Sequence, residues 1–279
     1  MDLRWGDPAE SSDYHRGSMS DQLSLRLEAA LPNAPASLRP MLARPLAEPF
    51  DSAKHLFEPV WGGVRALARI GPSDEPGGGD VTFIGEAGEV IAAPADLAGL
   101  AVRVAARSAV LDCEIVVVDA AGRLDLEELE RRLAGEPGRP LAYLAFDLLD
   151  LDGRSFLSIP LERRREQLRK VLRPGDEVVA VPAIVEEGRA LFDAVAGQGL
   201  AGIRARQRAG PYLPGVRSRL WRFIEIGGSK RRPREASDVL AAEVGGGARP
   251  TAPASRSAPV LALIRRLPLG LDEDLPARG

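Results

Sequence analysis

Apolar residues along the middle of the chain either alternate with polar ones or form short runs, which is the pattern of half-buried and fully buried β-strands. These stretches predict strands at residues 81–84, 110–118, 141–147, 177–181, 203–206 and 220–226. Other stretches repeat apolar residues at helical spacing and predict helices at residues 124–133, 161–172 and 187–196. Strands and helices do not alternate regularly. This order favours an α+β fold with largely antiparallel sheets.

Composition changes on both sides of this region. Residues 1–35 are polar and lack a sustained period, so we expect a flexible N-terminal arm. The folded domain is expected to span residues 36–231. Residues 232–259 are rich in Gly, Ala and Pro and predict a linker, and residues 260–279 predict a short C-terminal segment. These last two parts are too short to build a five-stranded barrel.

Composition also narrows the class of protein. The 279 residues include one cysteine, so no disulfide is possible within the chain, and the formal net charge is −3. There is no basic leader followed by an apolar run, and no long uncharged apolar stretch. We therefore expect a cytoplasmic protein without a membrane partner. Neither His15 nor His55 has the spacing of a metal site, so no bound metal is predicted.

Residues 57–67 carry the most informative motif, Phe-Glu-Pro-Val-Trp-Gly-Gly-Val-Arg-Ala-Leu. It resembles the nucleophile motif of ATP-dependent DNA ligases, Glu-x-Lys-x-Asp-Gly-x-Arg, in which the lysine forms a covalent intermediate with AMP. Glu58, Gly63 and Arg65 match this motif. Val60 stands at the lysine position and Gly62 at the aspartate position, so the motif lacks its nucleophile. No catalytic residue is predicted.

The remaining motifs of that family follow in order. The matching stretches are residues 40–43, 110–117, 145–153, 161–165, 199–206 and 212–225. The stretch 199–206, Gly-Leu-Ala-Gly-Ile-Arg-Ala-Arg, resembles the family's Gly-Leu-Glu-Gly-Val-Val-Ala-Lys. The resemblance implies an adenylation-domain fold, ATP-grasp-like, with two mainly antiparallel sheets flanked by helices around a nucleotide cleft.

By the same resemblance, nucleotide-binding positions fall on Glu58, Arg65, Glu114, Phe146 and Arg206. Phe146 would stack on adenine, Glu58 would lie at the base edge and Glu114 would contact ribose or metal. Each position has a simpler alternative. Phe146 lies in an apolar strand and is equally well read as a core residue. Arg65 and Glu114 are also suited to pairing with each other across an emptied cleft.

Several departures from the family remove charges that phosphoryl transfer uses. Ala201 stands where the family has a metal-binding glutamate, and Phe223 and Glu225 stand where it has lysines. Glu86 reverses the charge of a phosphate-binding arginine. The resemblance therefore implies a member without catalytic activity. ATP and Mg²⁺ would be cofactors only if activity were retained.

Basic residues gather in one part of the chain. Residues 201–235 contain ten Lys or Arg and two Glu. A basic edge of this kind neutralises DNA phosphates independently of sequence, although a solvated rim is the equally open alternative. The arginines expected on this edge as DNA-binding residues are Arg204, Arg208, Arg217, Arg219 and Arg222.

Two functional hypotheses follow. The first is a binding or scaffold module associated with DNA repair, which contacts DNA or a DNA repair protein. The alternative is an ATP-dependent DNA ligase or adenylyltransferase that joins nicks with an unconventional nucleophile or with a barrel domain supplied by a partner. The chain has only three lysines, Lys54, Lys170 and Lys230, and arginine cannot serve as the nucleophilic amine. This scarcity favours the first hypothesis.

Overall fold

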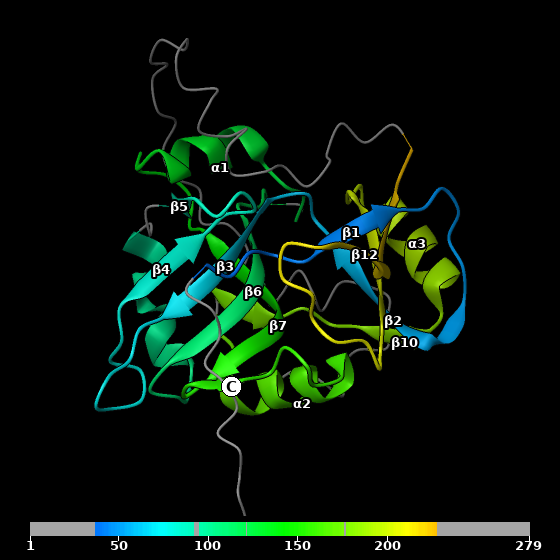
Figure 1. Ribbon diagram of the computed structural model, residues 1–279. Coiled ribbons are helices and arrows are strands. Elements are labelled where there is room, and N and C mark those ends of the chain that lie inside the picture. The colour runs from blue at the N-terminus through cyan, green and yellow to red at the C-terminus, as the bar shows by residue number, and fades with distance from the viewer. Residues whose placement is uncertain (1–36, 92–94, 121, 176, 228–279) are drawn as a thin grey trace, which may run out of the picture. The chain divides into compact units, whose positions relative to one another are not determined.

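The computed structural model describes residues 37–227, except 92–94, 121 and 176 (Figure 1). The chain divides into two units, Met1–Leu31 and Pro32–Gly279, and all described residues belong to the second. The predicted arm, linker and C-terminal segment lie outside the described residues.

Among the described residues, one sheet is five-stranded and mainly antiparallel. Its order is β1 (Leu42–Pro45), β12 (Arg217–Glu225), β11 (Gly202–Gln207), β2 (Ser52–Val60) and β10 (Ile184–Glu186). Only the β1–β12 pair in this sheet is parallel. The central strands β11 and β2 come from distant parts of the chain, so this sheet is built by long-range pairing.

A second sheet is formed by the part of the chain between β2 and β10. It has the order β5 (Val90–Ile91), β4 (Val81–Ile84), β3 (Val64–Ile70), β6 (Ala109–Val116), β7 (Ala142–Leu151) and β8 (Arg154–Ser155), and β9 (Val178–Ala180) pairs with β7 in parallel (Figure 1). Residues 61–63 connect β2 of one sheet to β3 of the other. This junction places the nucleophile-like motif between the sheets.

The helices of the described region are α1 (Leu126–Leu133), α2 (Leu161–Val171), α3 (Gly188–Gly197) and a 3₁₀ helix at Ala95–Arg103. Helix α1 begins after Asp125, whose side chain accepts a hydrogen bond from the backbone N–H of Glu128, as a helix N-cap does. Helix α2 packs against β7, and α3 packs against β11 and β2. The predicted helices are present, and their ends differ from the predicted ones by at most two residues.

Strands β6 and β7 show why this fold has a charged interior. Every residue of β6 is buried, as is every residue of β7 except the last. A strand covered on both faces is expected to be apolar throughout. These two strands instead carry Asp112, Glu114, Asp147 and Asp150 into buried positions. Buried carboxylates require partners, which the neighbouring elements supply.

The structure confirms the predicted α+β class with mainly antiparallel sheets. It adds strands that the periodicity did not identify. Strands β5 and β8 are two residues long, too short for a repeating pattern. Strands β2 and β3 enclose the motif at residues 57–67, and their apolar runs are interrupted by Glu58 and Arg65. A charged residue inside an apolar run argues against a buried strand. The residues that pair with these charges are remote in sequence, so the pattern alone did not identify the two strands.

Candidate functional site

The turn between β2 and β3 fixes the site's backbone. Gly62 has a φ of 89°, a conformation that residues with a side chain rarely adopt. A Cβ on Gly63 would lie 2.2 Å from the backbone oxygen of Ile115. One carboxylate oxygen of Glu114 accepts hydrogen bonds from the backbone N–H groups of Gly62 and Gly63, both at 2.6 Å. Both glycines and Glu114 therefore hold this turn closed.

The position matched to the family's lysine is apolar and enclosed. The Val60 side chain is fully buried, and its backbone oxygen accepts a hydrogen bond of 2.9 Å from Ala201 N–H. Ala201 is also fully buried. The lysines of the described region lie elsewhere. Lys54 is exposed near the start of β2, and Lys170 is exposed on α2 with its amine 3.1 Å from Glu166.

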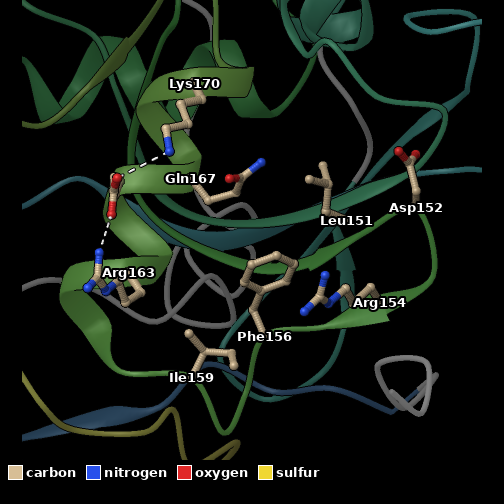
Figure 2. Close-up of a pocket in the computed structure, with 9 residues that line it drawn as sticks. Leu151, Asp152, Arg154, Phe156, Ile159, Arg163, Gln167 and Lys170 are labelled. Carbon is tan, nitrogen blue, oxygen red and sulfur yellow. Dashed lines mark hydrogen bonds and ion pairs between the residues drawn. The ribbon is translucent and has the colours of Figure 1, made fainter. Parts of the chain in front are cut away.

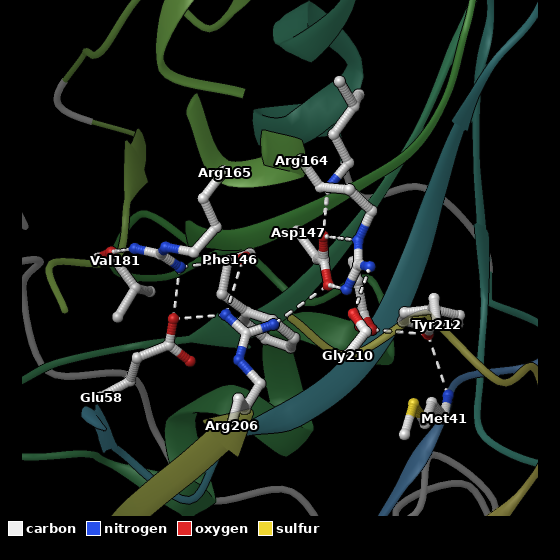
Figure 3. Close-up of polar contacts among 12 residues, drawn as sticks. Met41, Glu58, Phe146, Asp147, Arg164, Arg165, Val181, Arg206, Gly210 and Tyr212 are labelled. Carbon is white, nitrogen blue, oxygen red and sulfur yellow. Dashed lines mark hydrogen bonds and ion pairs between the residues drawn. The ribbon is translucent and has the colours of Figure 1, made fainter. Parts of the chain in front are cut away.

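Glu58 and Asp147 lie at the centre of a buried group of charges (Figure 3). Both Arg165 and Arg206 form ion pairs with Glu58. Arg206 also bonds Asp147 at 3.1 Å and donates to the Phe146 backbone oxygen at 2.7 Å. The carboxylate expected at a base edge is thus already paired with guanidinium groups from β11 and α2. We call Glu58, Asp147, Arg164, Arg165 and Arg206 the buried charge cluster.

Arg164 completes the pairing of Asp147. Its guanidinium donates two hydrogen bonds of 2.8 Å to the two carboxylate oxygens, and both side chains are fully buried. Such bidentate pairs are strong and geometrically specific. Burial alone would raise the pKa of Asp147, but the charge and hydrogen bonds of Arg164, with a contribution from Arg206, hold that pKa below its ordinary value. Asp147 is therefore a carboxylate in the folded protein.

A second buried pair joins Arg65 to Asp112. Arg65 donates to the two carboxylate oxygens at 3.1 and 2.6 Å, and the Tyr212 hydroxyl donates to one of them at 2.7 Å. The alternative in which Arg65 pairs with Glu114 is wrong. Arg65 and Glu114 are opposite each other in the β3–β6 ladder. Glu114 is occupied by the backbone of the glycine turn, however, so Arg65 pairs with its diagonal neighbour.

Guanidinium groups surround the ring of Phe146. Their central carbons lie 4.6 Å (Arg204), 5.1 Å (Arg206) and 5.5 Å (Arg65) from the ring centroid. The indole of Trp221 approaches the same ring edge-on at 6.5 Å. Phe146 is 2% exposed, so its ring offers no open face. An adenine placed on this ring would have to displace at least the nearest guanidinium.

Arg204 is the residue that sequence reasoning placed wrongly. It was expected on an exposed edge, but only 5% of it is exposed. Its backbone pairs with β2 and β12, but within the described part of the chain its guanidinium forms no hydrogen bond or ion pair. Burial, reinforced by the charge of Arg65, lowers its pKa, while Glu114 opposes that shift. Strand alternation was the available signal, because residues 204 and 206 share one face of β11.

The other arginines of the expected edge do not form one surface. Arg217 and Arg219 are exposed at the start of β12. In the β11–β12 ladder, Arg206 is opposite Trp221 and Ala205 is opposite Arg222, so Arg222 faces away from the buried charge cluster. Arg208 lies past the end of β11 and pairs with Glu162 at 3.0 Å. The exposed arginines are thus divided between the two faces of the sheet.

Arg164 and Arg165 are cluster residues that the sequence did not single out as functional. They lie in an Arg-rich stretch of α2 that reads as a solvated helix surface, yet both are buried. Their spacing from Leu161 and Leu168, at three or four residues, was the available signal, because residues at that spacing share a helix face. Cys113 is buried, with its Sγ 3.0 Å from the Ala66 backbone oxygen.

In the part of the chain that the structure describes, no group of three or more His, Cys, Asp or Glu side chains is arranged to hold a metal ion. None of the helices in that region is long and apolar enough to cross a membrane.

Comparison with known proteins places this geometry in context. The family model described as ATP dependent DNA ligase domain matches residues 40–223. A probable DNA ligase of Saccharopolyspora erythraea is 32% identical over 249 residues, covering 87% of this chain and 46% of that protein. The multifunctional non-homologous end joining protein LigD of Mycobacterium bovis is 31% identical over 188 residues, covering 66% of this chain and 23% of that protein.

Among solved structures, a mycobacterial DNA ligase D complexed with ATP and MES is similar with a TM-score of 0.57. Its sequence identity is 27%, and the match covers 67% of this chain and 60% of that chain. This chain spans about half or less of the length of the curated relatives described above.

Proposed function

The chain belongs to the ATP-dependent DNA ligase family, and we propose that it is a catalytically inactive member that binds DNA as a module in DNA repair. The observation that carries the proposal is the filling of the nucleotide-binding positions by the protein's own side chains. Glu58 is paired with Arg165 and Arg206, and the Phe146 ring is surrounded by guanidinium groups.

An adenine nucleotide does not fit these residues. A base needs a free aromatic face and a free hydrogen-bonding edge, and both are taken by arginine. In the family motif Gly-Leu-Glu-Gly-Val-Val-Ala-Lys, which residues 199–206 resemble, the position of Arg204 is a valine. The longer Arg204 side chain reaches the ring of Phe146. Displacing that guanidinium would require a new partner for a buried charge. ATP is therefore not a cofactor of this protein under the proposal.

The chain also lacks the side-chain groups that adenylation requires. Val60 has no amine to attack a phosphate, and Ala201 has no carboxylate to hold a divalent metal. Glu225 adds negative charge at a position where the family has a lysine, which opposes the charge that develops during phosphoryl transfer. Restoring the lysine alone would leave the base site blocked. Adenylation is consequently absent under this proposal.

DNA binding is proposed from the exposed arginines and from what the relatives are named for. The relatives include DNA ligases and an end-joining protein. Arg217 and Arg219 are exposed on β12, and Arg208 and Arg222 are partly exposed. Exposed guanidinium groups contact phosphates without reading sequence. Arg204, being buried, is removed from this set.

The test of inactivity is transfer of label from α-labelled ATP in the presence of Mg²⁺, followed by a denaturing gel. We expect no labelled protein from the native chain or from Val60→Lys. A labelled band from the native chain, mapped to Lys54 for example, would instead support a ligase that uses an unconventional nucleophile.

The test of the blocked base site is adenosine binding by calorimetry. We expect no measurable binding by the native chain and measurable binding by Arg204→Val, because valine leaves the Phe146 ring free on one side. Arg219→Val serves as the control, since it removes an exposed arginine that lies away from this ring. Adenosine binding by the native chain would show that the base site is open.

A further inference from the structure

A groove outside the buried charge cluster lies between α2 and the β7–β8 hairpin (Figure 2). Its volume is about 560 Å³, within the range of cavities that hold a small ligand. Three of its lining side chains are cationic, and one is aromatic. The lining residues are Leu151, Asp152, Arg154, Phe156, Ile159, Arg163, Glu166, Gln167 and Lys170.

Helix α2 supplies one wall of this groove. Arg163, Glu166, Gln167 and Lys170 follow the three- and four-residue spacing that brings side chains to one helix face. Glu166 is 3.1 Å from both the Arg163 guanidinium and the Lys170 amine. One carboxylate therefore holds two cations along the wall, and a net positive charge remains there.

The hairpin supplies the opposite wall. The carboxylate of Asp152 is committed to the protein, because it accepts hydrogen bonds from the backbone N–H groups of Arg107 at 2.7 Å and Ser108 at 3.1 Å. Arg154 lies 5.8 Å from the centroid of the Phe156 ring. It forms no ion pair with any other residue that the structure describes. Arg154 is thus the cation most available to an incoming anion.

Phe156 occupies the floor between these walls, with Ile159 beside it (Figure 2). The Arg154 guanidinium over the Phe156 ring is exposed, unlike the buried arginines around Phe146, and no ion pair with a described residue holds it there. A nucleotide presents a flat base and a phosphate together, so its base can replace Arg154 on the ring while Arg154 turns to the phosphate. An acidic peptide would use the cations but would gain little from the ring. The aromatic residue therefore decides between the two classes of ligand.

We propose that this groove binds single-stranded nucleic acid, with one unpaired base stacked on Phe156 and its phosphates near Arg154 and Arg163. The site shares no residue with the exposed arginines proposed above for DNA binding. Stacking on a ring tolerates any base, so binding is expected to be independent of sequence. Phosphate contacts make it weaken as salt increases.

The experiment measures fluorescence anisotropy of a labelled oligothymidine of about 12 nucleotides, a length within known single-strand site sizes. The full chain is titrated at low salt as the native protein, Phe156→Leu, Phe156→Tyr and Arg154→Ala. We expect Phe156→Leu to weaken binding about tenfold, since base stacking contributes on this scale. Phe156→Tyr keeps the ring and should bind like the native chain.

Arg169→Ala is the matched control for Arg154→Ala. Arg169 is also exposed and lies on α2, but it does not line the groove. Arg154→Ala should weaken binding more than Arg169→Ala, although both remove one positive charge. Equal weakening by the two variants would show a general charge effect and overturn the proposal.

Other outcomes also decide the question. Absence of oligothymidine binding by the native chain would overturn it, as would unchanged binding in Phe156→Leu. Competition by poly-glutamate that is insensitive to Phe156→Leu would assign the groove to acidic peptides instead. A double variant of Arg217 and Arg219 should leave oligothymidine binding intact, which separates this site from the DNA contacts proposed for those two arginines.

Discussion

Arg206 and Arg208 lie two residues apart and occupy opposite environments. The Arg206 side chain is 0% exposed and pairs with Glu58 and Asp147. The Arg208 side chain is 38% exposed and pairs with Glu162, which is itself 44% exposed. Both are arginine–carboxylate pairs. The comparison shows that the same residue type can be buried or exposed in this protein. The tertiary position of each arginine decides whether it lies in the core or in contact with solvent.

The physical difference lies in hydration. A guanidinium and a carboxylate buried together lose their water, and their attraction offsets that loss only when the remaining bonds are also satisfied. An exposed pair keeps most of its water and is screened by salt. The buried charge cluster is therefore sensitive to the removal of one member, while the exposed pairs are not.

Removing one carboxylate from each environment should give the largest contrast. Asp147→Ala leaves Arg164 and Arg206 with uncompensated buried charge and should lower the free energy of unfolding by about 3–5 kcal/mol. Glu162→Ala removes the exposed partner of Arg208 and should cost at most about 1 kcal/mol. Urea unfolding of both variants measures the difference. Similar losses would mean that the cluster is open to water.

Protonation of Asp147, which pairs with Arg164, should account for part of the loss of folding stability at low pH. The pKa of Asp147 in the folded protein lies below its ordinary value of 3.8. A carboxylate with a lowered pKa stabilises the fold above its unfolded pKa, and that contribution is lost as pH falls through the folded pKa. Asp147→Asn should therefore flatten the loss of stability below pH 3.8. Unfolding midpoints followed from neutral to acid pH test this, with Glu162→Gln as the exposed control.

DNA affinity should depend on the exposed arginines and not on the buried ones. Replacing Arg217 and Arg219 with alanine should reduce the slope of log affinity against log salt by about 2 if each contacts one phosphate. Anisotropy with labelled duplex DNA at several salt concentrations gives that slope. A double variant with the native slope would contradict this prediction, because Arg217 and Arg219 would then have no role in DNA binding.

Glu114 should show the smallest effect, and with the opposite sign in pH. Burial raises its pKa above the ordinary 4.5, although Arg204 and the N–H groups of Gly63 and Gly62 oppose the shift. Its contribution to stability is complete below pH 4.5 and falls as pH rises through the folded pKa. Glu114→Gln keeps an oxygen for both N–H groups and loses the charge. We expect it to be as stable as the native chain, or slightly more stable, at neutral pH by urea unfolding.

Family and fold class could be predicted because they depend on motifs and apolar patterns that follow one another along the chain. The Phe57–Leu67 motif, with Val60 in place of lysine, could be recognised from the sequence for the same reason. The glycines of that stretch match the turn they form, since Gly62 needs a positive φ. Short edge strands such as β5 and β8 were not predictable, because two residues carry no period.

By itself, the sequence determined which chemical groups this protein has: no lysine at position 60, a carboxylate at Glu58 and Asp147, and many arginines. Only the tertiary structure decided which of these groups meet. Arg65 pairs with Asp112 and not with Glu114, and Arg204 lies against Phe146 and not on an outer edge. The reason is that electrostatic pairing depends on distance and on exclusion of water. Both are set by strands and helices that lie far apart in the chain.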